Sequence, residues 1–176
     1  MLGHVLYRYL SDVSSLETFG TVRNPLCINS FSNYLRDKLI ANIDSDNFDL
    51  IRSLILQLKP DVIINCIGIV KQRPNSNDVL SILPVNSLLP HQIAKTISSL
   101  DTRLIQISTD CVFSGGKGMY SEIDKPDPVD LYGISKLLGE VSDNNLTIRT
   151  SIIGPEIFTR KSLLAWFLSQ QSQILG

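Results

Sequence analysis

The chain has 176 residues, of which 43% are apolar and 19% are charged. These values are typical of a globular protein with one buried core. Sixteen Lys and Arg against 17 Asp and Glu leave a net charge of −1, which argues against a nucleic-acid-binding or membrane-surface protein. The sequence contains no apolar run of the roughly 20 residues needed to span a bilayer and no secretory signal. Its three scattered cysteines fit a reducing compartment, so we expect a cytoplasmic protein.

The N-terminal part of the sequence predicts helices alternating with strands. A short helix over residues 2–10 is followed by a strand over 18–23. The next helix is predicted to begin after Asp46 as its N-cap, to carry apolar residues at helical spacing, and to end before Pro60. Residues 62–67 are apolar without alternation, which is typical of a central parallel strand with helices on both faces.

The C-terminal part continues this alternation around one long loop. The predicted elements are a helix over 85–100 that buries Leu88, Leu89, Ile93 and Ile97, a strand over 103–108, a loop over 110–130, a helix over 131–142, a strand over 146–150 and a helix over 161–171. Strands and helices in this order predict an α/β fold with a mostly parallel sheet.

Hydroxyl side chains and a tyrosine–lysine pair form the candidate catalytic site. In open parallel sheets, ligands bind at the carboxyl ends of the strands, and one predicted strand ends at Ser108 and Thr109. Tyr132 and Lys136 follow, four residues apart on one helical face. A nearby ammonium lowers the pKa of a phenol, so Tyr132 could transfer a proton to a substrate oxygen held by either hydroxyl. This arrangement favours oxidation or reduction at a carbonyl or alcohol carbon.

The Tyr-x-x-x-Lys spacing occurs a second time, at Tyr34 and Lys38. By itself, either copy is most simply an exposed helical face. Only Tyr132 follows a strand that ends in adjacent hydroxyl residues, with a loop of suitable reach between them. We therefore assign the catalytic role to the copy at Tyr132 and Lys136.

Four segments together resemble the extended short-chain dehydrogenase/reductases. They are residues 85–91, 108–113, 132–136 and 148–154, and the resemblance covers nearly the whole chain. Among these enzymes, the segments are most similar to the branch of dTDP-4-dehydrorhamnose reductase and its relatives. The resemblance implies a Rossmann-like, doubly wound parallel sheet and NAD(P)-dependent reduction of a nucleotide-linked 4-keto sugar by a Ser/Thr-Tyr-Lys mechanism. Alternatives within it are a nucleotide-sugar epimerase or dehydratase, a non-catalytic dinucleotide-binding regulatory subunit, and an inactive fragment.

The resemblance assigns roles to individual catalytic residues. Thr109 matches the catalytic hydroxyl position, with Ser108 beside it, and Tyr132 matches the acid–base tyrosine. Lys136 matches the lysine that also binds the nicotinamide ribose. The implied partner is a nucleotide-sugar substrate, and a homodimer stays open.

The resemblance also identifies candidate cofactor-binding residues. Gly3 matches the last glycine of the phosphate-binding motif, and Cys66, Ile67 and Gly68 match the segment lining the cofactor. Arg23 matches a position where a cation favours the 2′-phosphate, so we expect NADP(H) over NAD(H). Its alternative is an ordinary solvated loop charge. Asp44 matches the acidic position near the adenine and could equally be a capping residue.

Other candidates have simpler explanations. No His, Cys and carboxylate cluster has the spacing of metal ligands, so no metal site is predicted. Cys66 and Cys111 are expected to be small buried residues, and Trp166 and Phe167 to pack on a helix face. Residues 115–118 lack the spacing of a phosphate loop and are expected to form a turn.

The sequence departs from the family at both ends. The first strand and the first two glycines of the cofactor motif are missing, so the strands at 18–23 and near Ile40 lack a neighbour joining them to 62–67. We expect residues 1–154 to form an N-terminally incomplete NAD(P)-binding domain and residues 155–176 to begin a truncated substrate-binding domain. The chain is accordingly interpreted as a fragment of a longer reading frame, or as a sequence whose start codon is assigned too far downstream, and is expected to bind NADPH weakly.

Overall fold

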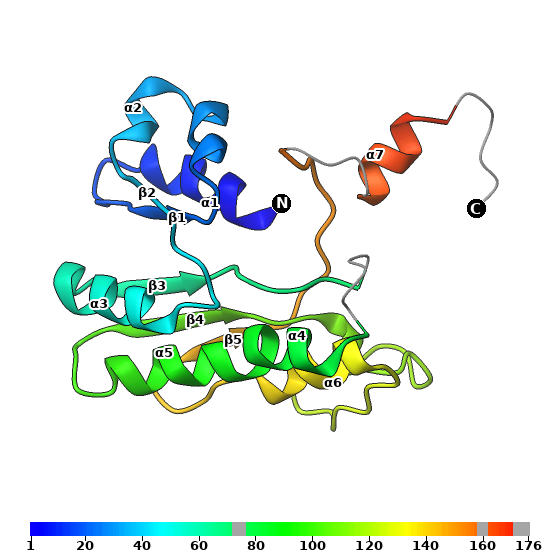
Figure 1. Ribbon diagram of the computed structural model, residues 1–176. Coiled ribbons are helices and arrows are strands. Elements are labelled where there is room, and N and C mark those ends of the chain that lie inside the picture. Colours follow the sequence, from blue (N-terminus) through cyan, green and yellow to red (C-terminus); the bar gives the residue numbers. More distant parts are fainter. Residues whose placement is uncertain (72–76, 158–161, 171–176) are drawn as a thin grey trace. The chain divides into compact units, whose positions relative to one another are not determined.

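The computed structural model describes residues 1–71, 77–157 and 162–170. The chain divides into two compact units, the first comprising Met1–Ile43 with Ile152–Gly176 and the second Asp44–Ser151. Each unit contains a parallel sheet (Figure 1), so the predicted α/β class is confirmed. The domain boundary at residue 154 stays a prediction. No helix of the described residues is long and apolar enough to cross a membrane.

The first unit is built on a two-stranded sheet. Its elements are α1 (Leu2–Ser11), β1 (Gly20–Val22), the 3-10 helix η1 (Pro25–Ser30), α2 (Asn33–Arg36), β2 (Leu39–Ala41) and α7 (Leu163–Leu168). A small core joins α1 to α2: the rings of Tyr7 and Phe31 pack edge to face at 5.6 Å. The Tyr7 hydroxyl donates a 2.6 Å hydrogen bond to the carbonyl of Leu35.

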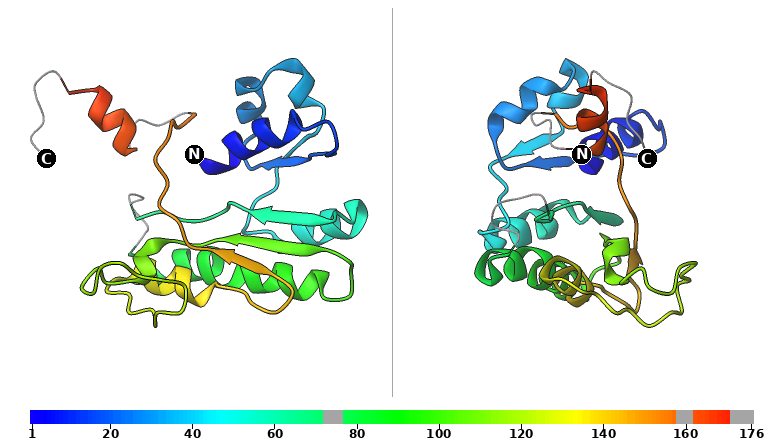
Figure 2. Two further views of the ribbon diagram at one scale, coloured as in Figure 1. Left: turned by 180° about the vertical axis from the view of Figure 1, so that it is seen from behind. Right: turned by 90° about the vertical axis from the view of Figure 1, so that its right-hand side faces the viewer.

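The second unit is built on a three-stranded sheet in the order β3-β4-β5. Its elements are α3 (Phe48–Leu58), β3 (Val62–Asn65), α4 (Val79–Leu83), the π-helix η2 (Pro84–Leu88), α5 (Leu89–Ile97), β4 (Arg103–Ile107), the 3-10 helix η3 (Asp110–Val112), α6 (Leu131–Leu138) and β5 (Leu146–Ile148). Both strand pairs are parallel. Figures 1 and 2 show α5 running alongside these strands, with α4 and α6 next to it.

The structure divides the predicted helix over 85–100 into η2, which ends at Leu88, and α5 over Leu89–Ile97. Leu89, Ile93 and Ile97 are buried as predicted. Leu88 is 53% exposed, so its predicted burial is wrong. It belongs to η2, and the wider turn of a π-helix changes the direction of the side chains relative to a continuous α-helix.

Several element ends differ from the prediction because side chains and backbone geometry end the elements locally. Asn47, not Asp46, caps α3, with its side chain accepting from Leu50 N. Strand β3 ends at Asn65 instead of residue 67, where the Asn65 side chain accepts from the Ile67 N–H. Helix α6 ends at Leu138 instead of residue 142, with Gly139 as its C-cap.

In the part of the chain that the structure describes, the strands form two hydrogen-bonded sheets, one in each unit. There, β1 pairs with β2, β3 pairs with β4, and no strand joins the two sheets. The ends of the helix predicted over 161–171 lie outside the described residues. Trp166 and Phe167 are 48% and 57% exposed, so their predicted packing is wrong: no residue of α7 is buried.

Candidate active site

The candidate catalytic residues of the second unit lie where β4 ends and α6 begins. Ser108 and Thr109 directly follow β4, and each is only 4% exposed. Tyr132 and Lys136 both lie on α6. The long loop between η3 and α6 thus returns the chain to the strand end, as predicted from the sequence.

Ser108 is bonded to a pair of residues that the sequence analysis missed. Its hydroxyl donates to Glu140 Oε1 at 2.8 Å. The two carboxylate oxygens of Glu140 also accept from Arg149, at 2.8 and 2.7 Å. The spacing of Glu140, four residues after Lys136, and the position of Arg149 directly after β5 could have indicated this pair. Because the Ser108 hydroxyl is already bonded to Glu140, Thr109 is the better candidate for the hydroxyl that holds a substrate oxygen.

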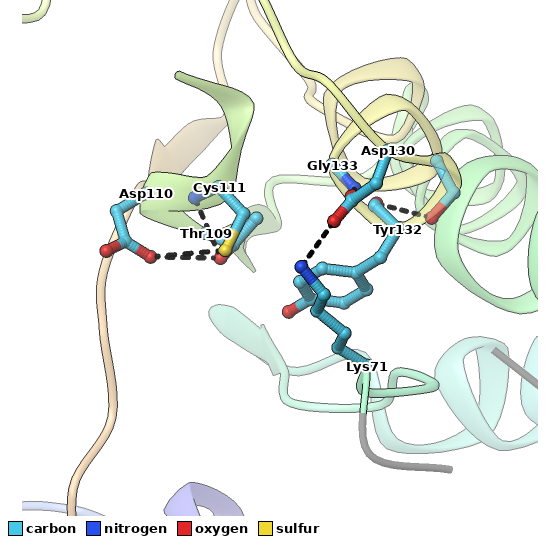
Figure 3. A network of polar contacts seen from close by, with 8 residues as sticks. Lys71, Thr109, Asp110, Cys111, Asp130, Tyr132 and Gly133 are labelled. Carbon is cyan, nitrogen blue, oxygen red and sulfur yellow. Dashed lines mark hydrogen bonds and ion pairs between the residues drawn. The ribbon is translucent and has the colours of Figure 1, made fainter. Parts of the chain in front are cut away.

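Thr109 lies between the end of β4 and η3 and is the N-cap of η3. The Thr109 hydroxyl donates to Asp110 Oδ1 at 3.2 Å, and its oxygen accepts from Cys111 N (Figure 3). Burial raises the pKa of Tyr132, and the charge of Asp110 contributes to that rise, whereas a hydrogen bond with Thr109 lowers the pKa.

Lys136 is almost completely buried, with 6% of its surface exposed. Its ammonium donates to the carbonyl of Ile107 at 2.6 Å. Burial lowers the pKa of Lys136 from its usual 10.5 to about 8, against the opposing charge of Glu140. The expected lowering of the Tyr132 pKa by Lys136 is wrong for this structure, because burial of the phenol dominates and raises that pKa.

The start of α6 is fixed by a carboxylate and by a close backbone approach. Asp130 caps the helix, with Oδ1 accepting from Gly133 N at 2.8 Å, and Oδ2 pairs with Lys71 Nζ at 2.6 Å (Figure 3). A Cβ at Gly133 would lie 2.3 Å from the Cys111 carbonyl oxygen. Only glycine allows α6 to pack this closely against η3.

The segment after β3 lies next to Lys136. A Cβ on Gly68 would lie 3.8 Å from Lys136 Nζ and 3.4 Å from Asn86 Oδ1. Cys66 is exposed, so its predicted burial is wrong: β3 has ended one residue earlier. Ile67 is half-buried.

Asn86 holds the segment after β3 in place. The sequence indicated this residue only as part of the segment 85–91. The residue is fully buried. Its side chain accepts from Ile69 N and donates to Ile69 O and to Ser135 Oγ, at 2.8, 3.0 and 3.0 Å. A buried amide with these three bonds joins η2, the segment after β3, and α6.

The remaining candidate cofactor residues lie elsewhere. Gly3 is on α1 and Arg23 follows β1; both belong to the first unit, so the second-unit site is described without them. Asp44 Oδ1 accepts from Asp46 N at 3.3 Å, but the cap of α3 is Asn47, so the capping alternative for Asp44 is wrong. Its role near an adenine stays a prediction.

Two further sequence interpretations concern metal ions and the glycine-rich loop. Among the described residues, no group of three or more His, Cys, Asp or Glu could hold a metal ion. Gly115 and Gly118 have φ values of 86° and 65°, the left-handed region that favours glycine. Neither residue lies in a helix, in keeping with the predicted turn.

Comparison with known proteins identifies a family over most of the chain. The family model described as RmlD substrate binding domain matches residues 1–160. Methionine adenosyltransferase 2 subunit beta of Bos taurus is 37% identical over 102 residues, which are 54% of this chain and 29% of that protein. A dTDP-4-dehydrorhamnose reductase of Aggregatibacter actinomycetemcomitans is 32% identical over 117 residues, 63% of this chain and 40% of that one. The matches therefore span less than half the length of either relative.

Solved structures show the same fold. A hypothetical dTDP-4-dehydrorhamnose reductase from Sulfolobus tokodaii is 32% identical, with a TM-score of 0.73 over 92% of this chain and 54% of its own. Two structures below 25% identity share the fold alone. They are a Bacillus anthracis dTDP-4-dehydrorhamnose reductase in complex with NADP, at a TM-score of 0.59, and a Bacillus cereus UDP-glucuronic acid 4-epimerase in complex with NAD, at 0.64.

Proposed function

Since the chain belongs to the RmlD substrate binding domain family, we propose that it serves NAD(P)-dependent reduction of a nucleotide-linked 4-keto sugar, in the manner of a dTDP-4-dehydrorhamnose reductase. The observation that most supports this proposal is the buried Lys136 of α6, which shares that helix with Tyr132 and donates to the carbonyl of Ile107 at the end of β4, directly before Ser108 and Thr109. The similarity to a curated dTDP-4-dehydrorhamnose reductase supports the substrate class.

The residues at this strand edge fit a nicotinamide cofactor. Gly68 presents backbone without a side chain near Lys136 Nζ, which leaves room for a ribose to approach that ammonium. The preference for NADP(H) over NAD(H) is proposed separately, from the sequence match of Arg23, a cation of the first unit directly after β1, to a position that favours a 2′-phosphate. When bound, the cofactor would supply the hydride for the carbonyl carbon.

Residues of the chain itself supply the proton for the substrate carbonyl oxygen. Tyr132 donates its phenolic proton to the substrate carbonyl oxygen, while the Thr109 hydroxyl holds that oxygen in place. The Ile107 carbonyl holds the Lys136 ammonium on the helix that also carries Tyr132. The Ser108 hydroxyl donates to Glu140, which follows α6, and so links the end of β4 to the end of that helix.

The direct test of the reductase function is a reaction with a dTDP-linked 4-keto sugar. The protein is incubated with NADPH or NADH, absorbance at 340 nm is followed, and the sugar product is identified. Net NADPH consumption with formation of the 4-hydroxy sugar is expected. An inverted sugar without net consumption would favour an epimerase, and no change of sugar or cofactor would contradict both enzymes.

The second candidate is a non-catalytic subunit of a larger enzyme. The 37% identity to methionine adenosyltransferase 2 subunit beta favours it. Its test is size-exclusion chromatography of the chain mixed with a methionine adenosyltransferase. Co-elution without turnover of NADPH favours the subunit, whereas turnover without co-elution favours the reductase.

A further inference from the structure

Lys71 and Asp130 join two segments of the second unit that meet near Tyr132. Lys71 follows β3 in the chain and Asp130 precedes α6, and their side chains form a 2.6 Å ion pair. The other oxygen of the Asp130 carboxylate accepts from Gly133 N. One carboxylate therefore binds both a lysine and the N-terminus of the helix that carries Tyr132 and Lys136 (Figure 3).

The charge of Asp130 acts on the phenol of Tyr132, two residues further along the chain. The groups that influence this phenol are Thr109, Asp110, Cys111 and Asp130, with Lys136 on the same helix. Burial is the main cause of the raised pKa of Tyr132, and the carboxylates of Asp110 and Asp130 add to it. Lys71 is the cation paired with Asp130, and in turn it lowers the pKa of that carboxyl, after the larger contribution of Gly133 N–H.

Resting on the proposed function, we propose that Lys71 is a positioning residue for Tyr132. Its ammonium holds the Asp130 carboxylate at the first turn of α6 and partly offsets the charge of that carboxylate, so that Asp130 raises the pKa of the phenol less than an unpaired carboxylate would. Tyr132 can then lose its proton to the substrate more readily.

This role differs from that of a stabilising surface ion pair. Lys71 is 62% exposed and Asp130 30%, and ion pairs between exposed groups contribute little to folding stability. Loss of the Lys71 charge should therefore leave the melting temperature of the protein unchanged. Its effect should appear in the titration of one tyrosine, which a merely structural ion pair would not change.

The test is a pH titration of the chain labelled with ¹³Cζ-tyrosine, followed by NMR, with the Tyr132 signal assigned by its loss in Tyr132→Phe. In Lys71→Gln, the midpoint for Tyr132 should move to higher pH, because the Asp130 charge is no longer compensated. In Asp130→Asn it should move to lower pH, since asparagine also caps helices but carries no charge. Lys71→Arg, which retains the cation, should titrate like the unmodified protein.

The matched control is Lys95→Gln, which removes one exposed lysine from α5 and should leave the Tyr132 midpoint unchanged. A Tyr132 midpoint in Lys71→Gln equal to or below that of Lys95→Gln would overturn the proposal, as would a failure of Lys71→Arg to match the unmodified protein. The titration needs neither cofactor nor turnover. The predicted shifts in a protein that never oxidises NADPH would thus contradict the proposed function and leave the role of Lys71 intact.

Discussion

The chain contains two tyrosine–lysine pairs with the same spacing in very different surroundings. Tyr34 is 64% exposed, and Lys38 lies beyond the end of α2 and pairs with Glu17 at 3.2 Å. Tyr132 is half-buried next to Thr109, and Lys136 lies inside α6 with 6% of its surface exposed. The spacing alone therefore says little about chemistry.

The difference comes from what surrounds each pair. The second pair follows a strand that ends in two hydroxyl residues and lies on a helix held close to that strand end. Burial then changes the pKa values of both side chains. The first pair has an exposed tyrosine and a half-exposed lysine, where water screens charges. Four variants, each with a matched control variant, test this difference.

The largest expected effect is that of Tyr132→Phe on turnover. Removal of the phenolic proton donor should lower kcat with the 4-keto sugar by about 1,000-fold. Tyr34→Phe removes the exposed phenol that donates to Asp12 and should leave kcat unchanged. Equal losses in the two variants, measured by NADPH oxidation, would contradict the distinction between the pairs.

A substitution at Gly139 tests how closely α6 is packed. A Cβ there would lie 1.9 Å from the Asn86 carbonyl oxygen, so Gly139→Ala should destabilise the protein by about 3 kcal/mol. Gly20→Ala in the first unit should cost about 1 kcal/mol, because its Cβ would meet side-chain atoms of Leu39 and Tyr7. Urea denaturation of both variants measures the difference, and a smaller loss for Gly139→Ala would show that α6 can move.

Loss of the Thr109 hydroxyl should lower activity much more than loss of the Ser108 hydroxyl. Thr109→Val should lower kcat by about 100-fold, since it removes the group expected to hold the substrate oxygen. Thr109→Ser should retain most activity. Ser108→Ala should mainly lower stability, by about 1 kcal/mol, because its hydroxyl is bonded to Glu140. A larger loss of kcat in Ser108→Ala than in Thr109→Val would reverse the assignment.

The last expected effect concerns the pH dependence of stability. The pKa of Lys136 is about 8 in the folded protein and 10.5 as its usual value, so between these pH values the unfolded chain binds the extra proton. Stability should therefore rise with pH across this window, by on the order of 2 kcal/mol. Denaturation at pH 8 and 10.5 should show this rise in Lys38→Met and lose it in Lys136→Met. The same rise in both variants would contradict the burial of Lys136 as its cause.

Much of the fold could be predicted from local patterns. The alternation of apolar segments and breakers predicted the parallel strands. Element ends were harder, because they depend on single side chains. The Asn65 amide that bonds Ile67 N and the Asn47 cap of α3 have no signal in the apolar pattern.

The sequence could predict only those site residues whose side-chain chemistry and position at the end of a predicted strand or on a predicted helix both indicate a role. Ser108, Thr109, Tyr132 and Lys136 gather around β4 and α6 as expected. The partners of these residues could not be derived, because Glu140, Arg149 and Asn86 act through contacts between distant segments. The carbonyl of Ile107, which holds Lys136, is a backbone group that no residue pattern indicates.

The central claim is that the pair Tyr132 and Lys136, and not Tyr34 and Lys38, lies at a nicotinamide-cofactor site. Its most direct test is a titration of the ¹⁵N-labelled protein with NADPH, followed by the amide signals in NMR, which also detects weak binding. The account predicts shifts at Gly68, Thr109 and Lys136, with the amides of residues 34–38 unchanged. Shifts confined to residues 34–38, or no shift at any NADPH concentration, would contradict it.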